Sequence, residues 1–187
     1  MKPLRRMLDV VPKLPRNTGN LRISSVIFGL ALLLSAGCST VVNQTVTFAE
    51  SDFQSYEARG TGLIQGHAFI RSDTGVKRGG AGIKISLVPL TAYTEERAMI
   101  MESGNEPGPM DPRLNKYVRT TVGDWGGAYR FEGLPAGKYL LYCKIEWEAQ
   151  YAGSLRRDAS GSSYALARTV LSGGEHKNVV ITNSGQK

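Results

Sequence analysis

Few side chains in this sequence could do covalent or metal chemistry. The chain of 187 residues has two cysteines, Cys38 and Cys143, and two histidines, His67 and His176. No Cys-x-x-Cys or His-x-x-x-His pair occurs among them. Because a zinc site needs three or four such ligands brought close together, we expect no metal site.

The motifs of common enzyme classes are missing as well. The sequence contains neither a Gly-x-Ser-x-Gly nucleophile elbow nor a phosphate-binding Gly-x-x-x-x-Gly-Lys-Ser/Thr loop. The carboxylate pair Glu95 and Glu96 suits the start of a helix, where acids complement the helix dipole. The pair Glu146 and Glu148 suits the solvent face of a strand. We therefore expect a protein that is not an enzyme and binds no cofactor.

Cys38 follows a segment with the layout of a secretory signal. Residues 1–22 carry six basic side chains against one acid, and an apolar stretch of 12 residues, 23–34, comes next. Small residues at 35–37 then lead to the cysteine, as at a signal cleavage site. The apolar stretch is shorter than the about 20 residues that a membrane-spanning helix needs.

The ending Leu34-Ser35-Ala36-Gly37-Cys38 resembles a lipobox, the bacterial site at which a diacylglycerol is attached to cysteine before cleavage. The resemblance implies that 1–37 is a lipoprotein signal peptide and that Cys38 becomes lipidated, although Ser35 stands where leucine is commonest. An ordinary cleaved signal with a nearby cysteine is the alternative, and Met7 is an alternative start. Ser39, in place of aspartate, implies an outer-membrane location.

The positive charge of the chain belongs mostly to this leader. The formal net charge is +7, but residues 1–37 hold 6 of the 23 basic and 1 of the 16 acidic side chains. The rest of the chain therefore carries 17 basic against 15 acidic side chains, without a basic stripe. Nucleic-acid binding is not expected from such a balance.

The part of the chain after the leader is long enough for one domain and consists mainly of short strand patterns. The clearest pattern runs from Tyr139 to Trp147, where every second residue is apolar and forms one buried strand face. Cys143 lies on that face, so we expect a buried and unreactive thiol. Further strands are expected near 62–71, 83–89, 117–122, 129–132, 165–171 and 177–182, between glycine-rich turns.

Only one helix is expected, from about Thr94 to Glu102, within a long connection. Its start combines a hydroxyl cap with acids in the first turn. The whole pattern predicts an all-β fold, an antiparallel Greek-key β-sandwich of about seven strands with one short helix in a long loop.

One stretch carries a more specific pattern, Thr121-x-x-Asp124-x-x-Gly127-x-Tyr129-x-Phe131-x-Gly133-Leu134-Pro135-Ala136-Gly137-x-Tyr139. It resembles the signature of carboxypeptidase-regulatory-like domains, which are transthyretin-like β-sandwiches related in shape to B-type collagen-adhesin repeats. The resemblance covers about 60–182 and implies a non-catalytic module in a bacterial lipoprotein. The chain then divides into a signal peptide (1–37), a tether (38–60) and a β-sandwich (61–187).

Two features could bind a ligand or a partner. The connection 92–116 is long for a compact sandwich and is a candidate functional loop, or it simply covers one end of the fold. Exposed aromatic rings can stack on sugars, and Trp125, Tyr151 and Tyr164 are the candidates. Trp125 is the preferred candidate for a sugar-binding residue because it lies in a turn. The alternative interpretation is that its ring packs over that turn.

Two hypotheses for function follow. The first is a non-enzymatic lipoprotein, anchored in the bacterial envelope, that acts as a structural or interaction module. Its partner would be another envelope protein, peptidoglycan or a polysaccharide. The alternative is a carbohydrate-binding module that uses Trp125 and neighbouring loop residues.

Overall fold

The computed structural model describes residues 40–71, 77–79, 82–148, 150–152, 155–158 and 160–183. The predicted signal peptide (1–37) and the predicted lipidation site Cys38 lie outside the described residues, as does the side chain of Tyr151. Among the helices that are described, none is long and apolar enough to cross a membrane.

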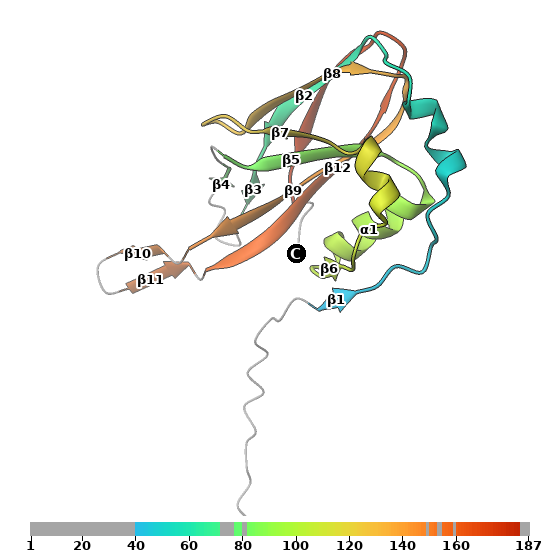
Figure 1. The fold of residues 1–187 in the computed structure, drawn as a ribbon. Helices are drawn as coiled ribbons and strands as arrows, with labels where there is room; N and C mark the ends of the chain where they lie inside the picture. The colour runs from blue at the N-terminus through green and yellow to red at the C-terminus, as the bar shows by residue number, and fades with distance from the viewer. Residues whose placement is uncertain are drawn as a thin grey trace, which may run out of the picture. The chain divides into compact units, whose positions relative to one another are not determined.

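Two sheets build the fold (Figure 1). The larger contains, in spatial order, β12 (Gly161–Leu171), β9 (Gly137–Trp147), β5 (Lys84–Pro89) and β7 (Arg119–Val122). The smaller contains β13 (His176–Ile181), β2 (Gly62–Ala68) and β8 (Ala128–Leu134). Their strands confirm the predicted β-sandwich.

The pairing within the two sheets is antiparallel with one exception, because β13 runs parallel to β2. A parallel pair needs a long crossover connection. Here the whole chain between the two strands provides it. Two short hairpins extend the sandwich: β3 (Ile70–Arg71) pairs with β4 (Lys77–Arg78), and β10 (Gln150–Ala152) pairs with β11 (Leu155–Asp158).

The space between the two sheets is filled by the apolar face of each strand. On β9, the alternate residues Tyr139, Leu141, Cys143 and Ile145 are all at most 5% exposed. They belong to one cluster with side chains of the smaller sheet, such as Phe131. The period of two in the sequence therefore predicted the buried face of this strand correctly.

The thiol of Cys143 is part of this core, and burial raises its pKa to about 12. Since the thiolate is the reactive form, we expect Cys143 to resist alkylation in the folded protein at mildly alkaline pH. A Cys38→Ser variant leaves it as the only thiol, and mass spectrometry should then detect labelling only after denaturant is added. Rapid labelling without denaturant would contradict the burial.

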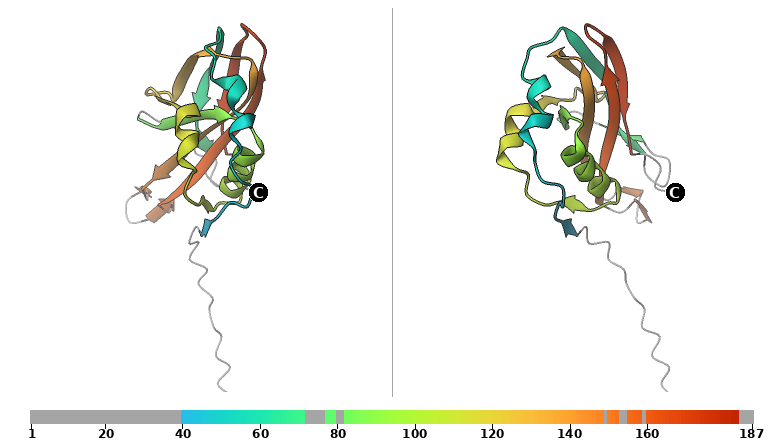
Figure 2. Two further views of the ribbon diagram at one scale, coloured as in Figure 1. Left: turned by 45° about the vertical axis from the view of Figure 1, so that its right-hand side comes forward. Right: turned by 90° about the vertical axis from the view of Figure 1, so that its right-hand side faces the viewer.

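A helix covers the outer face of the larger sheet (Figure 2). Helix α1 (Ala92–Glu102) places Ala98 and Met101 against Val88, Leu140 and Leu166 of that sheet. The predicted helix is confirmed, but it begins two residues earlier than expected. The cap is Thr91: its backbone N–H donates to Thr94 Oγ1, and its own hydroxyl oxygen accepts the N–H of Thr94.

Arg168 of β12 ties this helix to the sheet. Its guanidinium donates to the carboxylates of Glu95, at 2.9 Å, and Glu102, at 2.6 Å. The two acids are seven residues apart and so lie on the same side of the helix. These hydrogen bonds raise the pKa of Arg168 above its usual range, and the bond to Glu102 has the larger effect, followed by the bond to Glu95.

The stretch expected to be a tether, 38–60, is folded from Thr40 onward. Its first strand, β1 (Val41–Val42), pairs parallel with β6 (Glu106–Pro107), which follows α1. Two 3-10 turns, η1 (Glu50–Asp52) and η2 (Gln54–Tyr56), come next, and a third, η3 (Pro112–Tyr117), belongs to the long connection. We call residues 40–56 the strap.

Aromatic packing holds the strap in place. The ring of Phe53 is fully buried and stacks on Phe48 at 4.7 Å between centroids. The ring centroid of Tyr117 lies 4.9 Å from that of Phe53. These rings form a second apolar cluster, with Tyr93 and Leu114 from the connection. The strap is therefore part of the packed domain, because its aromatic side chains bury apolar area that a free tether would expose.

Candidate binding surfaces

Trp125 lies in the turn between β7 and β8 and is 92% exposed. It is the most exposed of the large apolar side chains among the described residues. Val122, three residues earlier at the end of edge strand β7, is 62% exposed. The alternative that Trp125 packs over its own turn does not hold, since only 8% of the residue is covered.

The turn that carries Trp125 is held by hydrogen bonds to Asp124. One carboxylate oxygen, Oδ1, accepts the backbone N–H groups of Gly126 and Ala128, both at 2.8 Å. These bonds lower the pKa of Asp124. Gly127 has a φ of +76°, and a Cβ there would come within 2.4 Å of the Ala68 carbonyl oxygen. The position therefore requires glycine, and the predicted turn is confirmed.

Tyr164 occupies a different environment from Trp125. Its hydroxyl donates to Glu106 Oε1 at 2.6 Å, and the ammonium of Lys144 lies 5.7 Å from its ring centroid. Lys144 also donates to Glu106 Oε2, at 3.1 Å. The hydrogen bond from Tyr164 is the main cause that lowers the pKa of Glu106. Tyr164 thus joins the sheet to β6 and is half-buried.

The structure does not bring Trp125 and Tyr164 together. Trp125 follows β7 at one edge of the four-stranded sheet, whereas Tyr164 lies on β12 at the other edge. Three strand spacings separate these edges, about 14 Å in all. Tyr151 lies on β10 in the hairpin beyond β9. Trp125 and Tyr164 therefore lie at opposite edges of the sheet.

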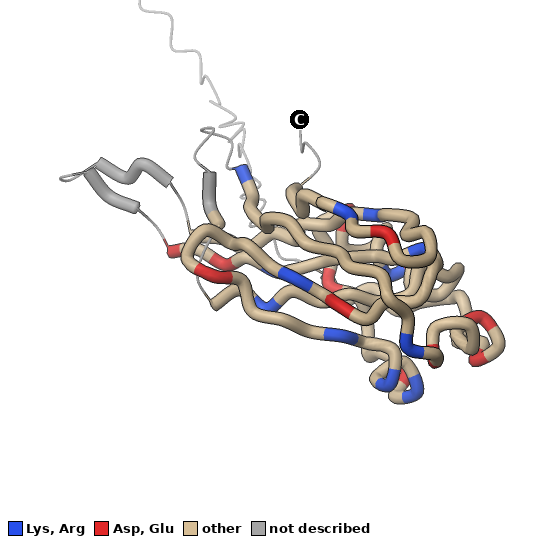
Figure 3. Tube along the Cα trace, turned by 90° about the horizontal axis from the view of Figure 1, so that it is seen from above, with Lys and Arg blue, Asp and Glu red and all other residues tan. Residues whose placement is uncertain are grey.

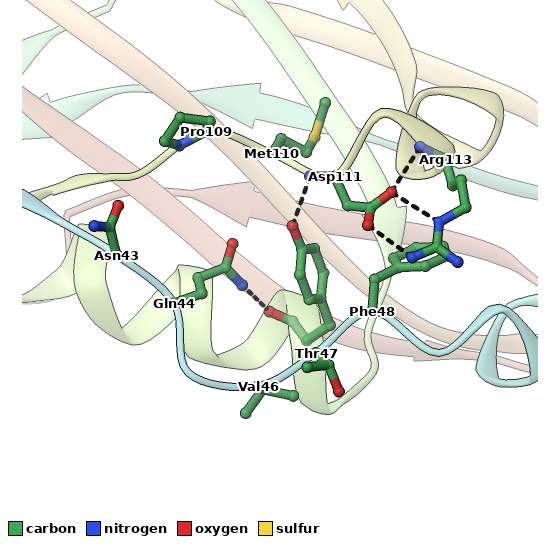
Figure 4. A pocket seen from close by; sticks show the side chains of 10 residues that line it. Asn43, Gln44, Val46, Thr47, Phe48, Pro109, Met110, Asp111 and Arg113 are labelled. Carbon is green, nitrogen blue, oxygen red and sulfur yellow. Dashed lines mark hydrogen bonds and ion pairs between the residues drawn. The ribbon is translucent and has the colours of Figure 1, made fainter.

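A shallow pocket of about 460 Å³ opens between the strap and the long connection (Figure 4). The strap contributes Asn43 through Phe48 except Thr45, and the connection contributes Tyr93 and Pro109, Met110, Asp111 and Arg113. The candidate loop 92–116 therefore does line a pocket. It also buries Tyr93 and covers the outer face of the larger sheet, whereas the plainer interpretation expected it to cover one end of the fold.

The polar groups of this pocket mostly bind one another. Gln44 Nε2 donates to the Tyr93 carbonyl, and the Tyr93 hydroxyl accepts the N–H of Asp111. The Asp111 carboxylate in turn binds the guanidinium of Arg113, which lies 4.8 Å from the Phe48 ring centroid. The pocket is therefore a junction between two segments, with its hydrogen-bonding capacity largely used.

Charge and metal-binding groups add no further candidate. In the part of the chain that the structure describes, basic and acidic residues are interspersed over the surface (Figure 3). The same residues contain no group of three or more His, Cys, Asp or Glu side chains placed to hold a metal ion.

The strap and its pocket were missed from the sequence. One signal was present: Phe48, Phe53 and Tyr56 give this stretch three aromatic residues within nine positions. Such spacing is unusual for a solvated tether, which has no apolar surface to bury. The spacing of these three aromatic residues matches the period of neither a strand nor a helix, so it predicted no regular secondary structure.

Comparisons with known proteins support the fold. No family model and no curated protein matches the chain. It is similar to the solved structure of a proposed carbohydrate-binding protein from Pseudomonas aeruginosa, with a TM-score of 0.62 and 23% identity over 73% of this chain and 98% of that one. A minor pilin of Streptococcus agalactiae aligns at 15% identity over 70% of this chain and 48% of the pilin, with a TM-score of 0.34. At these identities, the first likeness establishes a shared β-sandwich fold and nothing finer.

Proposed function

We propose that this protein is a non-enzymatic binding module, held in the bacterial envelope by a lipid on Cys38, and that it binds carbohydrate through Trp125. The observation that carries the carbohydrate proposal is the 92% exposure of Trp125 on a turn fixed by Asp124. The role proposed for the structurally similar Pseudomonas aeruginosa protein agrees with it.

The physical basis is the match between an indole ring and a sugar ring. The axial C–H groups of a pyranose make one face of the sugar apolar, and an open aromatic ring removes that face from water. Because Asp124 already fixes the turn, little backbone entropy is lost on binding. Burial of a single aromatic side chain contributes only about 2–3 kcal/mol, so each site binds weakly and many copies on one membrane act together.

The test is a glycan array probed with multivalent protein. We expect the Trp125→Ala variant to lose at least about tenfold in signal, since tenfold corresponds to about 1.4 kcal/mol. Trp125→Tyr is the matched control, because it keeps an aromatic ring at the same position and should retain most binding. Equal signals from Trp125→Ala and the parent would sink the proposal. If no glycan on the array binds the protein, and crosslinking in membranes captures a partner protein, the results would favour a protein-interaction module instead.

The anchor has its own test. The Cys38→Ser variant is expected to move from the detergent phase to the aqueous phase in a phase-separation assay, because two acyl chains are what hold a lipoprotein firmly. Its intact mass should lack the lipid. Cys143→Ala serves as the control and should stay in the detergent phase. Retention of Cys38→Ser in the detergent phase would contradict lipidation at this residue.

A further inference from the structure

We infer that the domain lies directly on the bilayer, with the strap and helix α1 forming the membrane-facing surface. The apolar side chains at this surface are Val41, Val46 and Met99. The inference rests on the lipid anchor at Cys38 proposed above. Beyond that anchor, the inference identifies the face of the domain that lies against the membrane and the faces that remain open to other ligands.

The first argument is the length of chain between the anchor and the fold. The carbonyl of Thr40 already accepts the N–H of Glu106, at 3.0 Å, and Val41 begins β1. Three residues from Cys38 to Val41 span at most about 11 Å when fully extended. With the lipidated cysteine at the level of the headgroups, β1 must lie within that distance of the bilayer. No spacer separates the domain from the membrane.

The second argument is the distribution of exposed apolar side chains. Seven large apolar residues are at least 37% exposed among the described residues, and three of them belong to the strap and α1: Val41 at 62%, Val46 at 37% and Met99 at 54%. The strap runs along the helix from the β6 end toward its first turns, since Val41 pairs with Glu106 and the Val46 N–H donates to Glu96 Oε2 at 2.8 Å. Met99 lies one helical turn from Glu96, so it is on the side of the helix whose Glu96 carboxylate binds the strap.

The third argument is that every carboxylate of α1 and β6 is already paired within the domain and therefore adds little repulsion toward the headgroups. Glu95 and Glu102 pair with Arg168, and Glu106 binds Lys144. Glu96 accepts the backbone N–H groups of Thr45 and Val46 and the Thr45 hydroxyl. The Thr45 hydroxyl is the first cause that lowers the pKa of Glu96. The four carboxylates of α1 and β6 thus all have partners within the domain.

The surface does not have to bind the membrane by itself. The acyl chains of a lipoprotein supply the anchoring, and a few apolar side chains at the headgroup level are enough to favour one orientation of the tethered domain. The same orientation places the strap pocket beside the membrane. Trp125, in the turn that follows edge strand β7, belongs to neither the strap nor the helix.

The experiment uses the full lipidated protein reconstituted into phosphatidylcholine vesicles that contain brominated lipid. A fluorescent probe is attached in turn to the Met99→Cys, Val180→Cys and Val122→Cys variants. Met99 and Val180 are matched controls for each other, because they are 54% and 55% exposed. Lipid blocks Cys38, and Cys143 is buried, so each variant carries one reactive thiol.

We expect a loss of fluorescence and a blue-shifted emission for the probe at Met99→Cys, and neither change at Val180→Cys or Val122→Cys. Equal quenching at all positions, or stronger quenching at Val122→Cys, would overturn the orientation. Flotation with the vesicles tests the anchor separately. Protein that fails to float contradicts the anchor and the orientation together, whereas floating protein without quenching at Met99→Cys contradicts only the orientation.

Discussion

The Phe131→Ala variant is expected to lose about 3–5 kcal/mol of unfolding free energy, which is the usual cost of removing a buried phenylalanine ring. Phe131 lies on β8, is 5% exposed and belongs to the cluster that joins the two sheets. Its ring centroid is 5.9 Å from that of Tyr129, its neighbour in the core. Urea titration followed by circular dichroism measures the loss as a lower midpoint.

Two aromatic residues in the same chain make this result interpretable. Trp125→Ala removes a larger ring, but one that is 92% exposed, so the free energy of unfolding should change by less than about 0.5 kcal/mol. Trp147 is only partly buried at the end of β9, where it packs against the core cluster. The Trp147→Ala variant should therefore lose an unfolding free energy between those of Trp125→Ala and Phe131→Ala. A cost for Phe131→Ala no greater than for Trp125→Ala would mean that the strand registers are wrong.

The Phe53→Ala variant is expected to cost a similar amount, about 3–5 kcal/mol, although Phe53 precedes the first strand of either sheet. The reason is its complete burial in contact with the rings of Phe48 and Tyr117. Removing the ring leaves a cavity in the cluster that joins the strap to the long connection. Chemical denaturation measures this loss, and proteolysis of the native protein should begin within the strap.

Val46→Ala is the control for this experiment, because Val46 lies in the same strap but is 37% exposed. We expect a change of less than about 0.5 kcal/mol for it. A change near zero for Phe53→Ala as well would show that the strap folds independently of the sandwich. The proposed membrane-facing surface would then lose its rigid support.

The strands were largely predictable from the sequence, as β9 illustrates. The alternation of Tyr139, Leu141, Cys143 and Ile145 with their neighbours identified the buried face, because side chains of a strand alternate between two faces regardless of its partners. The Asp124 turn was predictable for a similar reason. Its geometry depends on one carboxylate and on glycines within a few residues. Such local rules do not need the rest of the fold.

The candidate site was less predictable, because exposure of an aromatic ring depends on distant segments. Tyr164 was a candidate in the sequence together with the preferred Trp125, yet Glu106 binds the hydroxyl of Tyr164 from 58 positions away. Nothing comparable covers Trp125. The parallel pairing of β13 with β2 was missed for the same reason, since strand direction depends on how the whole intervening chain is routed.

The sequence by itself determined the fold class, the buried face of its clearest strand and the turn that carries Trp125, because periodicity and turn chemistry act over a few residues. Only the tertiary structure decided that the strap belongs to the domain and that Trp125 alone of the described candidates stays open to solvent. Both outcomes depend on whether residues tens of positions away in the sequence bury the side chain. Such long-range burial leaves no periodic pattern in the sequence of either segment. The structure therefore sharpens the proposal of an anchor at Cys38. The chain enters the folded domain at Thr40, so a lipid on Cys38 would hold the domain close to the membrane.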